Sequence, residues 1–139
     1  MQNTAEFLKN KGIMPSLQRI QIYNYIHGRK DHPSVEMIFS ALSSQIPTLS
    51  KTTVYNTLKN FTKVGIVTPV IIDENELRYD ADTQLHGHFI CKSCGNIFDF
   101  SGDFTKLDAP EIKDFDIKEY HIYLKGICKS CKSKKKQIN

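Results

Sequence analysis

Two Cys-x-x-Cys pairs constrain this chain more than any other feature of its sequence. They are Cys91 with Cys94 and Cys128 with Cys131, and they use all four cysteines of the protein. Each pair places two sulfurs on one tight turn, and four thiolates match the tetrahedral shell of closed structural zinc sites. The 33 residues between the pairs exceed the spacing of a short zinc ribbon, so a small subdomain would fold between them. A redox-active dithiol is the alternative for one such pair, but two pairs without a fifth cysteine favour zinc.

The composition is that of a globular protein. Of the 139 residues, 40% are hydrophobic and 24% are charged, and the net charge is a mild +4, which does not by itself indicate nucleic-acid binding. No uncharged apolar run reaches the roughly 20 residues that cross a bilayer, and the first residues lack a signal-peptide pattern. We therefore expect a cytoplasmic protein without membrane contact, in which cysteines stay reduced and bind metal.

Three helices and a hairpin are predicted in the first half of the chain. Apolar residues recur every three positions between Gly12 and His27, as along one stripe of a helix. A second helix opens at Pro33-Ser34, and Ser50 is the predicted N-cap of a third over 51–63. Two strand-like runs separated by a polar turn follow, at 66–72 and 76–80. This order is that of a winged helix-turn-helix domain, whose last helix enters the major groove of DNA.

The third predicted helix has an outer face suited to DNA. Val54, Leu58 and Phe61 fall on its inner side, and it contains no acidic residue. Its outward Lys and Thr side chains can donate to phosphates, and its Tyr and Asn side chains can reach base edges. These candidates are Lys51, Thr52, Thr53, Tyr55, Asn56 and Lys59. A solvated helix face or a protein-contact surface is the alternative, but the neighbouring helices and hairpin favour DNA.

The second half of the chain predicts a smaller unit after a short hinge. The hinge covers residues 81–85, and strand-like segments follow at 86–91, 96–100 and 117–127. A weak helical signal covers 103–115, and the lysine-rich residues 132–136 are expected to be a disordered tail. A unit this thin buries little core, so we expect it to dimerise. The predicted fold class is α+β, with a winged helix-turn-helix DNA-binding domain over 1–80 and a small α/β dimerisation and metal-binding domain, with its four-cysteine zinc site, over 86–139.

A second metal site is predicted beside the cysteines. His86 and His88 are two positions apart, which puts both imidazoles on one face of a strand. Asp80 lies a few residues upstream, and a hairpin after the first cysteine turn would return Asp99 beside His86. His32 is distant in sequence. Each of these residues also has a simpler role as a surface or turn residue, but together imidazoles and carboxylates suit Fe(II), Mn(II) or Zn(II).

Seven motifs run through nearly the whole chain in a characteristic order. They are Gln18-Arg19, His32-Pro33-Ser34, Ser50-Lys51-Thr52-Thr53-Val54-Tyr55-Asn56-Thr57-Leu58, Arg78-Tyr79-Asp80, His86-x-His88-x-x-Cys91-x-x-Cys94-Gly95, Ile97-Phe98-Asp99-Phe100 and Gly126-x-Cys128-x-x-Cys131. Taken together, they resemble the motifs of the ferric uptake regulator family of bacterial metal-dependent repressors. Within the family the chain looks most like the peroxide-sensing branch, because Asp99 stands where iron-sensing members typically carry glutamate and Asn56 where they typically carry arginine.

The resemblance implies a homodimeric repressor of a palindromic double-stranded DNA operator. It adds Arg19 to the DNA-binding candidates and implies structural Zn(II) on the four cysteines. It also implies a regulatory site for Fe(II) or Mn(II), made of His32, Asp80, His86, His88 and Asp99. Since these ligands come from both domains and from the wing between them, a bound ion would fix the angle between the domains and shift the dimer towards its DNA-binding state.

The resemblance further implies how peroxide would be sensed. In the peroxide branch, Fe(II) reacts with hydrogen peroxide and nearby imidazoles are oxidised, which by position would be those of His32 and His86. An iron- or manganese-responsive repressor without peroxide sensing is the alternative. Two positions depart from the family pattern. Leu17 replaces a usual proline in the first long helix, and Gly87, between the two histidines, would loosen the regulatory site.

Two other function classes are less consistent with the sequence. A metal-dependent hydrolase or redox enzyme could be built on His86 and His88, but no nucleophile–base pair accompanies these histidines. A purely structural zinc module would not need the helical first half. We therefore expect a regulator and not an enzyme.

Overall fold

The computed structural model describes residues 3–73, 75–84, 86–103, 106 and 108–138. The chain divides into two compact units, Met1–Thr83 and Gln84–Asn139. The division falls within the predicted hinge, of which Leu85 lies outside the described residues. Within the described part of the chain, no helix combines the length and the apolar character that crossing a membrane requires.

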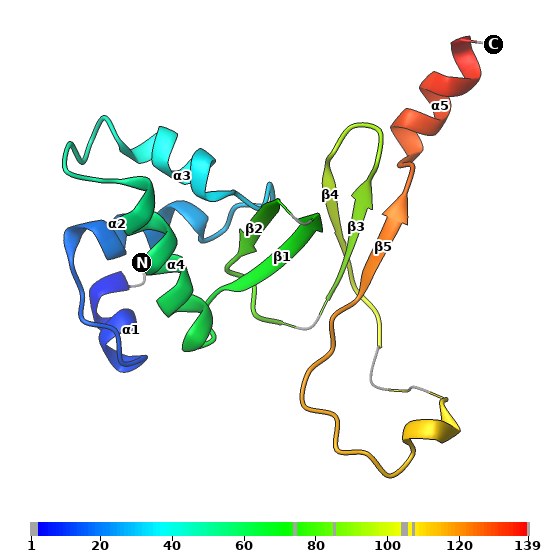
Figure 1. Cartoon of the computed structure of the whole chain (residues 1–139), viewed down its shortest axis with the longest axis horizontal. Coiled ribbons are helices and arrows are strands. Elements are labelled where there is room, and N and C mark those ends of the chain that lie inside the picture. Colours follow the sequence, from blue (N-terminus) through cyan, green and yellow to red (C-terminus); the bar gives the residue numbers. More distant parts are fainter. Residues whose placement is uncertain (1–2, 74, 85, 104–105, 107, 139) are drawn as a thin grey trace. The chain divides into compact units, whose positions relative to one another are not determined.

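In its described residues, the first unit contains four helices followed by a β-hairpin (Figure 1). Ser16 caps α2 by accepting the backbone N–H of Arg19 at 3.2 Å, so this helix begins at Leu17 and not at Gly12 as predicted. α1 was not expected from the sequence. The elements are α1 Thr4–Asn10, α2 Leu17–Ile26, α3 Val35–Leu42, α4 Lys51–Lys63, β1 Thr68–Asp73 and β2 Glu76–Asp80.

α4 follows its prediction residue for residue. Ser50 accepts the backbone N–H of Thr53 at 3.1 Å, which satisfies one of the unpaired donors at the start of a helix. Val54, Leu58 and Phe61 are fully buried, and burying each such side chain contributes about 1.5–3 kcal/mol. They join one core with residues of α1, α2 and α3. The opposite side of α4 is thereby left towards solvent.

The second unit is a three-stranded sheet with a helix at its end (Figure 1). The strand order is β4-β3-β5, in which β3 pairs with β4 antiparallel and with β5 parallel. The elements are β3 Gly87–Cys91, β4 Ile97–Phe100, the 3₁₀ helix η1 Pro110–Ile112, β5 Tyr123–Gly126 and α5 Lys129–Ile138. The α+β class and the winged-helix order of the first unit are as predicted.

Three local predictions in this unit were wrong. Within 103–115 the described residues form only η1, since Pro110 lacks the N–H that a longer helix requires; residues 104, 105 and 107 lie outside the described part. Of the predicted strand 117–127, only Tyr123–Gly126 pairs with a neighbour. The predicted disordered tail 132–136 belongs to α5, which fits the good helix propensity of its lysines.

The sheet has two chemically different faces. Phe89 pairs with Phe98 on one side and Leu124 on the other, and this row lies on one face because side chains alternate along a strand. His88 heads the neighbouring row and pairs with Asp99 and Tyr123 on the opposite face. Phe98 is 43% exposed and Leu124 is 51% exposed. One face is therefore apolar and open, and the other carries the predicted metal ligands.

Candidate metal sites and nucleic-acid face

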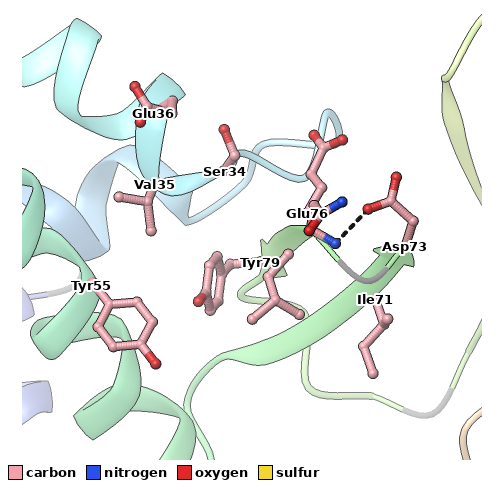
Figure 2. A pocket seen from close by; sticks show the side chains of 10 residues that line it. Ser34, Val35, Glu36, Tyr55, Ile71, Asp73, Glu76 and Tyr79 are labelled. Carbon is pink, nitrogen blue, oxygen red and sulfur yellow. Dashed lines mark hydrogen bonds between the residues drawn. The ribbon is translucent and has the colours of Figure 1, made fainter.

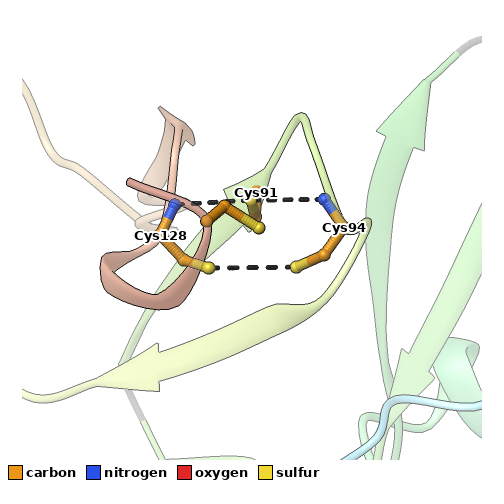
Figure 3. Close-up of side chains that lie close together, drawn as sticks. Cys91, Cys94 and Cys128 are labelled. Carbon is orange, nitrogen blue, oxygen red and sulfur yellow. Dashed lines mark hydrogen bonds between the residues drawn. The ribbon is translucent and has the colours of Figure 1, made fainter. Parts of the chain in front are cut away.

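The four cysteines gather at one end of the sheet in the second unit, and Figure 3 shows three of them. All four sulfur atoms lie within 4.8 Å of one another, and those of Cys94 and Cys128 are 3.9 Å apart. All four are free thiols. Tetrahedral zinc with Zn–S bonds of about 2.3 Å requires sulfurs roughly 3.8 Å apart. The cluster therefore has the ligand set and the spacing of a structural zinc site.

Hydrogen bonds and burial shift the pKa values of two thiols in this cluster. The backbone N–H groups of Cys94 and Cys128 donate to the sulfur of Cys91 at 3.4 and 3.3 Å and lower the pKa of that thiol to about 6. At Cys94 the Asn96 amide favours the thiolate, but desolvation and the surrounding sulfurs outweigh it and raise the pKa of Cys94 to about 11. Ionisation of Cys91 is therefore favoured and that of Cys94 is opposed, and a metal cation bound beside them would favour the thiolate form of Cys94.

His86, His88 and Asp99 lie close together on the face of the sheet opposite the apolar row of Phe89, Phe98 and Leu124. The Nε2 atoms of the two histidines are 3.1 Å apart. Asp99 Oδ1 lies 3.6 Å from His86 Nε2 and 3.5 Å from His88 Nε2. Donors that bind one ion at about 2.1 Å lie roughly 3.0–3.5 Å from one another. The pairing of β3 with β4 thus brings together three predicted ligands at the separations that a shared ion needs.

Contacts around the two histidines set their orientation. His86 Nδ1 is 2.6 Å from the carbonyl oxygen of Gln84, and a donated Nδ1–H leaves the lone pair on Nε2, the form that binds metal. The ring of His88 stacks on Tyr123 with centroids 6.0 Å apart, and its backbone N–H donates to Ile122. The sequence indicated neither contact, because both depend on how the folded chain arranges these segments.

Gly87 has a packing role in this sheet. The ring of Phe100, its cross-strand partner, lies where a side chain at position 87 would begin, since three ring atoms would fall within 3.0 Å of an added Cβ. An aromatic ring over a glycine is a known way to close a sheet face. We infer that Phe100 fills the space left by Gly87, which opposes the loosening expected from the sequence.

His32 and Asp80 form a buried pair in the first unit. His32 lies in the loop before α3 and Asp80 ends β2, and their Nε2 and Oδ2 atoms are 3.3 Å apart. Their side chains are 1% and 4% exposed. His32 has φ +51°, in the left-handed region, which costs a residue other than glycine about 1–3 kcal/mol. The surrounding structure must therefore hold this histidine in place.

Arg78 holds the loop that carries His32, a role the sequence did not indicate. Its Nε donates to the carbonyl of His32 at 2.6 Å, and its Nη2 donates to the carbonyl of Asp31 at 3.2 Å. The backbone N–H of Tyr79 donates to the carbonyl of Pro33 at 3.0 Å. β2 therefore binds three successive carbonyl groups of this loop.

The DNA-binding candidates lie on two flanks of α4. Arg19, Thr53 and Asn56 line one groove of about 340 Å³ between the start of α2 and α4. Lys51 Nζ lies 2.8 Å from Glu36 Oε2. Such an exposed ion pair contributes about 0–1 kcal/mol, so a DNA phosphate can replace Glu36 as the partner of Lys51. Thr52 and Lys59 are also exposed.

Tyr55 lines a second and larger groove, of about 870 Å³, between α4, the start of α3 and the hairpin (Figure 2). Ile71 and Tyr79 form part of its apolar wall, and the acidic side chains of Asp73 and Glu76 also line it. These carboxylates repel phosphate groups, so the flank with Arg19 and Asn56 is the one suited to the DNA backbone.

Comparisons of the sequence and of the structure with known proteins point to the same family. The sequence pattern of the ferric uptake regulator family matches residues 10–125. The peroxide-responsive repressor PerR of Staphylococcus epidermidis is 33% identical over 137 residues, covering 95% of this chain and 90% of the relative. The ferric uptake regulator of Vibrio cholerae has a similar structure, with TM-score 0.75 and 27% identity over 91% of this chain and all of the other. PerR of Streptococcus pyogenes gives TM-score 0.51 and 30% identity over 91% of this chain and 88% of the other.

Proposed function

Because this chain belongs to the ferric uptake regulator family, we propose that it is a metal-dependent DNA-binding repressor that senses hydrogen peroxide through oxidation of histidine at a regulatory Fe(II) site. The same ligands would serve an iron- or manganese-responsive repressor without peroxide sensing, which is the alternative. Either function is that of a regulator, not an enzyme, and a DNA-binding protein with four reduced cysteines would act in the cytoplasm.

One observation carries this proposal: the histidine and aspartate candidates are divided between the two units. The first unit offers the pair His32 and Asp80, and the second offers His86, His88 and Asp99. The second set is a group of two histidines and one carboxylate, which can hold Fe(II) with water in the open positions, and the two donors of the first set would raise the number of protein ligands to five. We propose that one ion takes all five residues, so that its binding energy depends on how the units are arranged.

The peroxide chemistry needs an imidazole beside the regulatory ion. Fe(II) bound there would supply the electron that breaks the O–O bond of hydrogen peroxide. The imidazole of His32 or His86 would then exchange a C–H bond for a C–O bond and return one electron to the iron, while the second oxygen atom leaves as water with the released proton. Over the whole step the ring loses two electrons, the peroxide gains two, and the iron is again Fe(II). The oxidised ring is a poorer ligand, and the arrangement that favours DNA loses its stabilisation.

The regulatory state would be a homodimer held by the second unit. The open apolar row of Phe89, Phe98 and Leu124 supports this, since contiguous exposed apolar surface marks interaction sites. A dimer would present two copies of α4 to successive major grooves of a palindromic operator. Leu124→Glu is expected to give a monomer that retains zinc, as measured by light scattering and metal analysis. A variant that remains a dimer would exclude this surface.

Peptide mass spectrometry tests the sensing step. Protein loaded with Fe(II) and treated with hydrogen peroxide should gain about 16 Da (one oxygen atom) on His32 or His86, and protein loaded with Mn(II) should not. His121 is an internal control, because it is exposed and pairs only with Glu119 among the contacts described for it. Oxidation that spreads equally to His121 would indicate diffusing radicals, and unmodified histidines would favour the alternative.

Salt dependence tests the DNA face. Each lysine that neutralises a phosphate changes the slope of log affinity against log salt by about 0.9. Lys59→Ala should therefore reduce the slope by about this amount for operator and non-specific DNA alike. Lys113→Ala, in the second unit, is the matched control and should leave the slope unchanged. An unaltered slope for Lys59→Ala would remove Lys59 from the interface.

A further inference from the structure

One arginine, Arg78, donates two hydrogen bonds to the backbone of the loop that carries His32. The guanidinium of Arg78 uses Nε and Nη2 on the carbonyls of His32 and Asp31, and its Nη1 lies 3.0 Å from Glu76 Oε1. The Arg78 side chain is only 18% exposed. All three nitrogens of the guanidinium are therefore occupied, and two of them fix successive carbonyl groups of one backbone segment.

The two hydrogen bonds from Arg78 constrain the backbone angles φ and ψ of His32, which set the direction of its side chain. The direction of a residue's carbonyl and of the preceding one together fix its φ and ψ, and these angles set the direction of its Cα–Cβ bond. His32 sits at φ +51° before a proline, where an extended backbone is normally preferred. Without the two donated hydrogen bonds, the loop would relax towards that extended form and turn the imidazole away from Asp80.

A second anchor holds the other side of the same loop. Arg29 makes two hydrogen bonds to the Asp31 carboxylate, at 3.0 and 2.6 Å, and its guanidinium lies over the Tyr25 ring at 4.3 Å. Asp31 is thus held through its side chain by α2 and the following turn, and through its carbonyl by Arg78. Of these two arginines, Arg78 is the one whose contact reaches His32 itself.

We propose that Arg78 is the positioning residue of the regulatory site, and that it sets metal affinity by holding His32 in its left-handed backbone conformation beside Asp80. This rests on the proposed function, in which His32 and Asp80 are ligands. The planar fork of arginine presents donors in a fixed geometry, whereas the lysine ammonium is a point charge on a flexible stem. Geometry, not charge, is therefore the property that matters at position 78.

Binding of Mn(II) alone to the zinc-loaded full-length chain tests the proposal. Removing a partner that orients a metal ligand typically lowers metal affinity about 10–100-fold. Arg78→Lys, which keeps the charge, and Arg78→Gln, which removes it, should both lower Mn(II) affinity by that factor. Glu76→Gln is the matched control, since it weakens the third contact of the guanidinium but neither bond to a carbonyl, and it should change affinity much less than either Arg78 variant.

A double-mutant cycle with His32→Ala separates positioning from general loosening. If Arg78 acts through His32, then Arg78→Lys combined with His32→Ala binds Mn(II) as His32→Ala alone does. The visible spectrum of Co(II) in the same site gives a second measure, and Arg78→Lys should resemble His32→Ala. One zinc ion per chain and an unchanged melting temperature would show that the variants are folded.

The outcomes distinguish a failure of the positioning role of Arg78 from a failure of the proposed regulatory site. Unchanged Mn(II) affinity in Arg78→Lys, or losses that multiply in the double variant, would overturn the role of Arg78. No effect of His32→Ala on Mn(II) affinity would instead overturn the proposed regulatory site. Should Arg78→Gln fail to fold, Arg78→Lys and the Glu76→Gln control still decide the question.

Discussion

The cysteine cluster and the histidine–aspartate candidates differ in how they are distributed over the fold. All four cysteines belong to the second unit, on elements that its own sheet brings together. The five histidine and aspartate candidates come from both units, two from the first and three from the second. Ligands of one unit can stabilise that unit, but ligands of two units can also couple them.

This difference separates a structural metal site from a regulatory one. A metal whose ligands all lie in one folded unit contributes to the stability of that unit whatever the arrangement of the chain. A metal shared between two units binds more tightly in the arrangement that brings its ligands together, and by the same amount it stabilises that arrangement. We expect perturbation of the first cluster to affect folding and perturbation of the second to affect DNA binding.

Loss of one cysteine is expected to have the largest effect. Cys128→Ser should abolish zinc binding and unfold the second unit. Structural zinc contributes an apparent ~10–16 kcal/mol in small zinc domains, which is comparable to the total stability of about 5–15 kcal/mol of most domains. Zinc analysis and circular dichroism would measure this. A folded, zinc-free dimer would show that the cluster is not structural.

Removal of the regulatory ion by a chelator is expected to have the next largest effect. EDTA should lower operator affinity by the full coupling factor, roughly 5–150-fold, and added Mn(II) should restore it. One zinc ion per chain should remain throughout, because four thiolates bind zinc much more tightly than imidazoles and carboxylates bind Mn(II). Loss of both metals at the same chelator concentration would contradict the distinction between the two clusters.

Asp80→Asn should have a smaller effect of the same kind. The amide keeps one oxygen donor but loses the charge, so we expect Mn(II) affinity to fall roughly tenfold, as a charge-assisted contact becomes a neutral one. Operator binding should return at higher Mn(II) concentration. Asp82→Asn, a neighbouring exposed acid, is the control. Equal effects of the two variants would point to net charge and not to ligation.

The smallest effect is expected at Gly87. Gly87→Ala places a methyl group against the Phe100 ring, and overpacking of this kind costs about 1–3 kcal/mol. We expect lower thermal stability, a few-fold loss of Mn(II) affinity and unchanged zinc content. Phe100→Leu in the same chain should recover part of the loss by making room. A Gly87→Ala variant as stable as the parent would mean that the ring moves aside freely.

Much of the fold followed from local patterns. The bounds and cap of α4 were predicted because a serine N-cap and an apolar stripe are properties of nearby residues in the sequence. The four cysteines were recognised as one zinc cluster because pairs on tight turns hardly depend on the rest of the chain. α1 and α5 were missed or mistaken, because their helical pattern is short and, in α5, largely polar.

The candidate ligands show which features of a metal site can be predicted from the sequence and which cannot. Their residue types and the two-residue spacing of His86 and His88 were enough to nominate them, because imidazoles and carboxylates are chemically suited to Fe(II) or Mn(II). The contacts that aim them were not predictable. The stacking of Tyr123 on His88, the ring of Phe100 over Gly87 and the hydrogen bonds of Arg78 to the His32 loop each join segments distant along the chain.

The sequence by itself therefore indicated the chemistry to expect of this protein: which side chains are candidates to bind metal, which helix is the candidate to face DNA and where a hinge is expected. Only the tertiary structure decided how those side chains are oriented. The physical reason is that ligand type is a property of a single residue, whereas orientation depends on hydrogen bonds and packing that exist only once distant strands and loops have come together.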